Sequence, residues 1–163
     1  MATVVGIIFG ILLTAIIFDE SLKVTISYQY VQLKIGDKVE TIEKKEVLVI
    51  YIENKWLIIL GENSNELYRK AIETKSESVC EVFQQYHYPW VDKDPYENQY
   101  QSWVLGHPDF SEKINALLHS REIALRNDKK KDAKHFQEDS AKVGIIIKDE
   151  RNGQYVRFAN NPH

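Results

Sequence analysis

Cysteine is nearly absent from this chain of 163 residues, and Cys80 is the single example. One thiol cannot form an internal disulfide bond, and it cannot supply a paired-cysteine zinc site. Only four prolines and seven glycines are present, which excludes collagen-like and linker-type low-complexity sequence. The formal net charge of −3 excludes a globally basic nucleic-acid-binding protein.

Catalytic and cofactor-binding motifs are missing as well. The five histidines are scattered without the H-x-x-x-H or H-E-x-x-H spacing of zinc sites. The sequence has no G-x-S-x-G, P-loop or dinucleotide-binding fingerprint. Glu138 and Asp139 are adjacent, but neighbouring side chains on a helix point about 100° apart, which is a poor geometry for an acid–base pair. We therefore expect a non-enzymatic protein with no catalytic residue, metal or cofactor.

Residues 2–18 form one uncharged apolar run that ends at Asp19. As a helix the run would reach about 26 Å, against about 30 Å of hydrocarbon in a bilayer. A signal peptide and a buried core element are the alternatives, but no Lys or Arg precedes the run. The pattern predicts a transmembrane helix within residues 1–18, alone or as the last helix of a longer membrane region. This expectation makes the lipid bilayer a partner and places the protein at the cell membrane, with a cytoplasmic body.

From residue 22 the apolar residues alternate with polar ones, which is typical of half-buried strands. Further strands are expected at 31–35, 38–44, 47–52, 56–60 and 67–72, and residues 76–86 have the spacing of an amphipathic helix. This order predicts a small β barrel or sandwich closed by a helix. Residues 19–91 resemble the bacterial pleckstrin-homology-like (PH-like) fold, which implies a module able to bind a protein partner.

Prolines and acidic residues near residues 87–95 mark a boundary before a second domain, 92–163. We expect a short helix at 96–105 with Tyr100, Trp103 and Val104 inward, and longer helices at 111–125 and 132–143. The Asn152-Gly153 pair between two apolar runs is a strong hairpin signal. The fold class expected for the whole chain is therefore α+β: a membrane helix, a PH-like module, and a helical subdomain that ends in a β-hairpin.

The segments INALLHSREIAL and KKKDAKHFQEDSAKVGIIIKDERNGQYVR resemble the C-terminal anticodon-binding subdomain of cysteinyl-tRNA synthetases, over about residues 112–158. The matching positions are Arg121, Ala124, Gly144, Ile145, Ile147, Asp149, Gly153 and Arg157. The HIGH and KMSKS motifs of the synthetases are absent, which excludes aminoacylation. The whole chain resembles the YqeB-like family of bacterial membrane proteins, a family from which no biochemical activity carries over.

Charge within this second domain is locally basic. Residues 126–135 contain five cations and two acids, Asp128 and Asp132, which leaves a net charge of +3. Such a patch can contact a few phosphates, or it can meet anionic lipid headgroups. The candidate RNA-binding residues, from this patch and from the resemblance, are Arg121, Arg126, Lys129, Lys130, Lys131, Lys134, Asp149 and Arg157. The leading hypothesis is a membrane-tethered protein whose tail binds tRNA or another structured RNA. The alternative is a purely protein-binding scaffold.

Overall fold

The computed structural model describes residues 11–17 and 20–159. The chain divides into two compact units. Unit 1 contains the residues up to 62 together with 67–94, and unit 2 contains 63–66 together with the residues from 95 onward. The short segment 63–66 is therefore part of unit 2, although its neighbours in sequence belong to unit 1.

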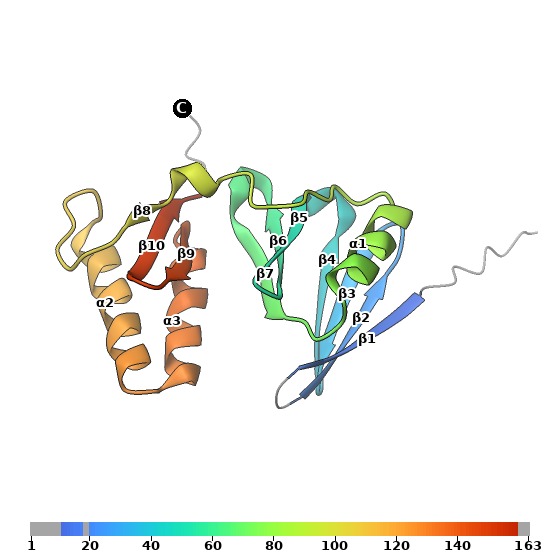
Figure 1. Cartoon of the computed structure of the whole chain (residues 1–163), viewed down its shortest axis with the longest axis horizontal. Coiled ribbons are helices and arrows are strands. Elements are labelled where there is room, and N and C mark those ends of the chain that lie inside the picture. Colours follow the sequence, from blue (N-terminus) through green and yellow to red (C-terminus); the bar gives the residue numbers. More distant parts are fainter. Residues whose placement is uncertain (1–10, 18–19, 160–163) are drawn as a thin grey trace, which may run out of the picture. The chain divides into compact units, whose positions relative to one another are not determined.

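Unit 1 begins with a four-stranded antiparallel sheet in the order β1-β2-β3-β4 (Figure 1). Its strands are β1 (Ile11–Ile17), β2 (Glu20–Ile26), β3 (Tyr30–Ile35) and β4 (Lys38–Glu43). Alternation decides which side chains are buried, so that Val24 and Ile26 of β2 and Val31 and Leu33 of β3 face the core. The turn between β3 and β4 is made by Gly36 and Asp37.

The predicted membrane helix is wrong in the part that the structure describes. Ile11–Ile17 is a strand, and it pairs with β2 in a register that sets Ile11 opposite Ile26 and Ile17 opposite Glu20. Residues 2–10 and 18 lie outside the described residues. Among the described helices none combines the length and the apolar character needed to cross a bilayer. The bilayer partner and the cell-membrane localisation rested on that helix, and they are withdrawn with it.

The physical reason lies in the composition of the run. β-Branched residues such as Ile11, Thr14 and Ile16 lose rotamer freedom in a helix and fit a pleated sheet. The alternating segment that follows, Glu20–Ile26, supplies the antiparallel partner. An uninterrupted apolar run carries no period of its own, so it cannot separate a buried strand from a helix.

A second sheet of unit 1 has the order β5-β6-β7. It consists of β5 (Val47–Glu53), β6 (Trp56–Gly61) and β7 (Glu66–Ala71), with the 3₁₀ turns η1 (Lys44–Glu46) and η2 (Glu62–Ser64) before β5 and after β6. Asn54 and Lys55, with φ of 49° and 66°, form the tight turn between β5 and β6. A later segment of the chain pairs with the free edge of β5, because the Ile50 N–H donates to the Pro89 carbonyl at 2.8 Å.

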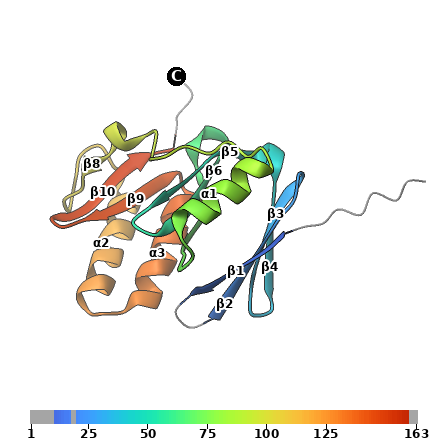
Figure 2. The same cartoon turned by 45° about the vertical axis from the view of Figure 1, so that its right-hand side comes forward.

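Helix α1 (Ser76–Gln85) packs against both sheets of unit 1 (Figure 2). Its buried residues Val79 and Phe83 join one core with Ile26 of the first sheet and Ile50 of the second.

The predicted barrel or sandwich is corrected by the strand pairing of unit 1. Pairing stops between β4 and β5, so the described strands form two separate sheets and no closed barrel. The interruption falls at η1, where the chain leaves the first sheet.

Unit 2 is a helical hairpin packed on a small sheet of order β8-β10-β9 (Figures 1 and 2). Its elements are η3 (Glu97–Gln99), β8 (Gln101–Ser102), α2 (Glu112–Arg126), α3 (Lys130–Lys142), β9 (Ile145–Glu150) and β10 (Gly153–Phe158). The Ser111 hydroxyl caps α2 by accepting from the Ile114 N–H. The core contains Trp103, Phe110, Leu118, Ile147 and Val156.

The helix expected at 96–105 is wrong. The segment contains a single 3₁₀ turn and the short strand β8, which pairs with β10 through Ser102 opposite Tyr155. Trp103 is buried as expected, but Val104 is 61% exposed. The β10 strand offers an unpaired edge, and that tertiary pairing outweighs the local preference of the segment. The expected C-terminal hairpin is therefore two strands of a three-stranded sheet.

Candidate nucleic-acid interface

The β9–β10 hairpin positions the polar residues that the sequence singled out in unit 2. Arg151 and Asn152 make its turn, and Gly153, the first residue of β10, has a φ of 134° that side-chain-bearing residues rarely adopt. Along β10 the buried residues are Gln154, Val156 and Arg157. A glutamine and an arginine thus point into unit 2, where each needs hydrogen-bonding partners.

Arg121 is buried at the centre of a polar network between α2 and this hairpin. Its guanidinium donates to both carboxylate oxygens of Asp149, at 2.7 and 2.6 Å. It also donates to the side-chain carbonyl of Gln154 at 2.8 Å and to that of Gln137 at 3.2 Å. Gln154 in turn donates to the Leu118 carbonyl at 3.0 Å. Arg121 is only 3% exposed, so its charge is compensated by these partners inside the protein.

The sequence pattern pointed to Arg121 and Asp149 but not to the two glutamines that complete the network. A signal for Gln154 was present, because it lies two residues before the apolar Val156 and so shares its face of the strand. No comparable signal marked Gln137, which lies on the exposed helix α3 and is identified only by the packing of that helix against α2.

Arg157 is held in a second buried site within unit 2. Its guanidinium donates to the Ser64 hydroxyl at 3.0 Å and to the Ser64 carbonyl at 3.2 Å. The same group lies over the ring of Tyr96, at 4.7 Å from the centroid, and over that of Tyr100 at 5.5 Å. Cation–π contacts of this kind stabilise a desolvated arginine. Arg157 is therefore buried, with its guanidinium bound to partners inside unit 2.

The other five candidates are exposed, and they surround the turn between α2 and α3. We call this group the basic turn: Arg126, Lys129, Lys130, Lys131 and Lys134. Asp128 makes the bend with a φ of 54°. Three members of the group have an acidic neighbour, namely Arg126 with Glu122, Lys130 with Asp128, and Lys134 with Glu138. Within the described part of the chain, Lys129 and Lys131 have no ion-pair partner.

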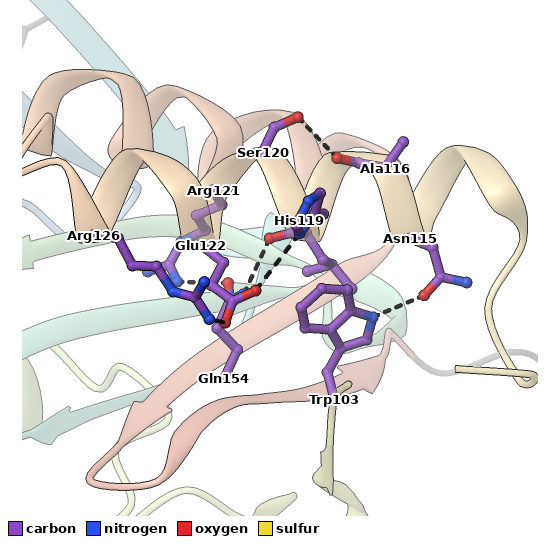
Figure 3. A network of polar contacts seen from close by, with 10 residues as sticks. Trp103, Asn115, Ala116, His119, Ser120, Arg121, Glu122, Arg126 and Gln154 are labelled. Atoms are coloured by element: carbon purple, nitrogen blue, oxygen red, sulfur yellow. Dashed lines mark hydrogen bonds and ion pairs between the residues drawn. The ribbon is translucent and has the colours of Figure 1, made fainter. Parts of the chain in front are cut away.

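Ion pairing is denser on the two helices that flank the basic turn. On α2, Glu122 receives Arg126 at 2.7 Å and lies 3.6 Å from the Nδ1 atom of His119 (Figure 3). On α3, Asp139 accepts from Lys142 at 2.7 Å and lies 3.4 Å from His135. The hydrogen bond from Lys142 lowers the pKa of the Asp139 carboxyl. At the turn itself, Lys129 and Lys131 are the two cations that keep a charge without an acidic partner among the described residues.

The structure therefore separates the eight candidates into two sets. Arg121 and Arg157 are buried in internal networks, and Asp149 is bound to Arg121 from the exposed side, whereas the basic turn is open to solvent. Among the residues that the structure describes, no group of three or more His, Cys, Asp and Glu side chains has the geometry of a metal site.

Comparison with known proteins also finds two different segments in the chain. Residues 1–91 match the family described as YqeB-like bacterial PH domain, and residues 107–157 match the cysteinyl-tRNA ligase anticodon binding domain. Both are binding modules and neither is a catalytic one. The chain belongs to the YqeB-like bacterial PH domain family.

A relative supports the same assignment along nearly the entire chain. The Uncharacterized protein YqeB of Bacillus subtilis (strain 168) is 33% identical over 160 residues, which is 98% of this chain and 67% of that protein. No solved structure matches the chain. The resemblances inferred from the sequence, to a YqeB-like protein and to the synthetase subdomain, are confirmed.

Proposed function

We propose that this protein binds a structured RNA, such as a tRNA, through phosphate contacts at the basic turn, without catalysing a reaction. The observation that carries the proposal is the clustering of five exposed cations at one turn, two of which have no acidic partner in the described part of the chain. Lysine and arginine at such a site bind phosphates by displacing counterions. The match of residues 107–157 to an anticodon-binding domain makes RNA the favoured polyanion.

The first turn of α3 adds to this electrostatic argument. Lys129 occupies its N-cap position, and no side chain caps the helix there. The free N–H groups at a helix N-terminus and the positive end of its dipole both favour an anion. Asp132 in the same turn offsets part of that field, so the lysines supply most of the attraction.

Recognition by this surface should depend on the shape of the RNA more than on its sequence. Phosphate contacts fix position and register but do not distinguish bases. Asp149, which could accept from a base edge, is exposed, but both of its oxygens already accept from Arg121. The groups of the basic turn are cations on flexible stems, and these recognise backbone.

The direct test is purification of the full chain from cells, followed by the ratio of absorbance at 260 and 280 nm and sequencing of the RNA recovered after ultraviolet crosslinking. The wild type should carry RNA, and the Lys129→Gln/Lys131→Gln double variant should carry much less. Lys34→Gln/Lys38→Gln is the matched control, because it removes the same charge from exposed positions on the first sheet of unit 1. Equal RNA recovery from all three proteins would refute the assignment of the site.

A further inference from the structure

Unit 2 has a second surface feature, a groove of about 510 Å³ that lies apart from the basic turn, at the opposite end of α2. One wall is the loop at 105–108, and the other is the first half of α2. Leu105, Phe110 and Ala116 contribute to a lining that is almost wholly apolar. Leu105 is 63% exposed and offers its apolar side chain at this wall of the groove.

The groove is preformed, because one side chain fastens the loop to the helix. The Asn115 amide donates to the carbonyls of His107 and Phe110, at 3.0 and 2.8 Å. The amide oxygen of Asn115 accepts from the indole N–H of Trp103 at 2.9 Å (Figure 3). The amide nitrogen and the amide oxygen of the Asn115 side chain are thus both bound to the segment that leads through this loop. A wall fixed in this way loses little entropy when a ligand binds.

The charges at the rim of the groove have the opposite sign to those of the basic turn. Asp109 and Glu112 are exposed, and within the described residues neither carboxylate has a hydrogen-bond or ion-pair partner. Lys113 is the one cation between residues 104 and 119. Glu122, beside the groove-lining His119, is already paired with Arg126, so the negative charge of the rim comes from Asp109 and Glu112 and exceeds that of Lys113 by one. This rim repels phosphate and attracts cations.

We infer that the groove binds a segment of a partner protein that carries a bulky apolar side chain flanked by lysine or arginine. The apolar side chain would fill the space between Leu105, Phe110 and Ala116, and the flanking cations would meet Asp109 and Glu112. The same charges exclude an RNA backbone from this face. The inference does not depend on the proposed RNA function, because the two surfaces have opposite charge and lie at opposite ends of α2.

The test is selection of random displayed peptides on the immobilised full chain, with counter-selection on Ala116→Arg. Ala116 is an exposed helix position, and arginine is a good helix former, so this variant fills the groove and keeps the helix. The selected peptides should share a large apolar residue with Lys or Arg close to it. A synthetic peptide of that sequence should bind Ala116→Arg about tenfold more weakly than the wild type.

Two further variants keep the test decisive. Leu105→Ser removes an apolar wall without changing the helix, and it should weaken the same peptide by a similar factor. Glu112→Gln should weaken it about threefold, as an exposed ion pair allows, whereas Glu81→Gln on α1 should have no effect. RNA recovery should be unchanged in Ala116→Arg, and peptide binding should be unchanged in Lys129→Gln/Lys131→Gln.

Several results would overturn the inference. One is a selection that yields no peptide preferring the wild type to Ala116→Arg, and another is a selection that yields acidic peptides. Loss of RNA from Ala116→Arg would assign the groove to the RNA-binding face instead. Concentration-dependent dimers abolished by Ala116→Arg would show that a second copy of the chain fills the groove.

Discussion

Arg121 and Asp149 form a two-pronged ion pair between α2 and β9, with the guanidinium 3% exposed and the carboxylate 54% exposed. The buried arginine therefore depends on the aspartate to compensate most of its positive charge. The exposed aspartate, in contrast, could be solvated by water without the arginine. An asymmetric pair of this kind fixes the hairpin against the helix. It contributes to the geometry of unit 2, on which the position of the basic turn depends.

Removal of Asp149, the exposed partner, should therefore lower the free energy of unfolding. In Asp149→Ala the buried guanidinium loses two charge-assisted hydrogen bonds, so the free energy of unfolding should fall by about 1–3 kcal/mol. Glu150→Ala, one residue further along the hairpin, is the control and should change it by less than about 0.5 kcal/mol. Urea denaturation measures both variants. Equal stability of the two would show that the ion pair does not stabilise unit 2.

Arg157→Lys tests the second buried arginine. Lysine keeps the charge, but it cannot donate to both oxygens of Ser64 while it also lies over the rings of Tyr96 and Tyr100. We expect the variant to lose about 1–3 kcal/mol in urea denaturation. Arg151→Lys, at the exposed hairpin turn, should have no measurable effect. A urea-denaturation curve of Arg157→Lys identical to that of the wild type would mean that charge alone, and not the planar guanidinium, is required.

Phe83 is the aromatic centre of the unit 1 core. It is fully buried, and its ring lies edge-on to Tyr88 at 5.5 Å and stacked on Trp90 at 6.0 Å. Phe83→Ala should therefore lower the free energy of unfolding by about 3–5 kcal/mol. Gln84→Ala, exposed on the same helix, should leave it nearly unchanged. If both variants unfold at the wild-type urea concentration, α1 is not part of the core.

Tyr88 should make the stability of unit 1 depend on alkaline pH. Its hydroxyl donates to the Ser27 carbonyl at 2.9 Å, and burial raises the pKa of Tyr88 from 10.0 to about 12. The unfolded chain releases this proton first, so stability is complete below about pH 10 and falls as the pH rises towards about 12. The loss attributable to this residue is at most about 3 kcal/mol, at about 1.4 kcal/mol for each pKa unit.

Tyr88→Phe separates this contribution from the rest. The variant should be about 1 kcal/mol less stable at neutral pH because the hydrogen bond is removed. Its stability should then fall less steeply than that of the wild type above about pH 10. Some slope should persist, because burial also raises the pKa of Tyr68. Parallel curves for the two proteins would exclude Tyr88 as a source of the pH dependence.

Much of the fold follows from local patterns in the sequence. Alternation located β2 and β3, a β-branched run located β5, and the 3- and 4-residue spacing of Val79, Phe83 and their neighbours located α1. The Asn152-Gly153 pair located the final hairpin. These signals work because each reflects a local geometry that the finished fold keeps.

Features that depend on distant contacts were not predictable in the same way. The strand β8 depends on the edge of β10, about 54 residues further along the chain, whereas the strand Ile11–Ile17 was missed because an uninterrupted apolar run has no period of its own. At the candidate site, composition located the basic turn correctly as an exposed cluster. The burial of Arg121 and Arg157 depends on Asp149 and Ser64, which are 28 and 93 residues away in sequence, and no local pattern reports such a pairing.

The salt dependence of RNA binding tests the central claim most directly. For the wild type, the logarithm of the association constant should fall linearly with the logarithm of salt concentration. Replacing Lys129, Lys130 and Lys131 together by glutamine should reduce that slope by about two, at roughly 0.7 for each phosphate of single-stranded RNA that the variant no longer neutralises. An identical slope in the triple variant, or a wild-type protein with no RNA affinity at low salt, would contradict the account.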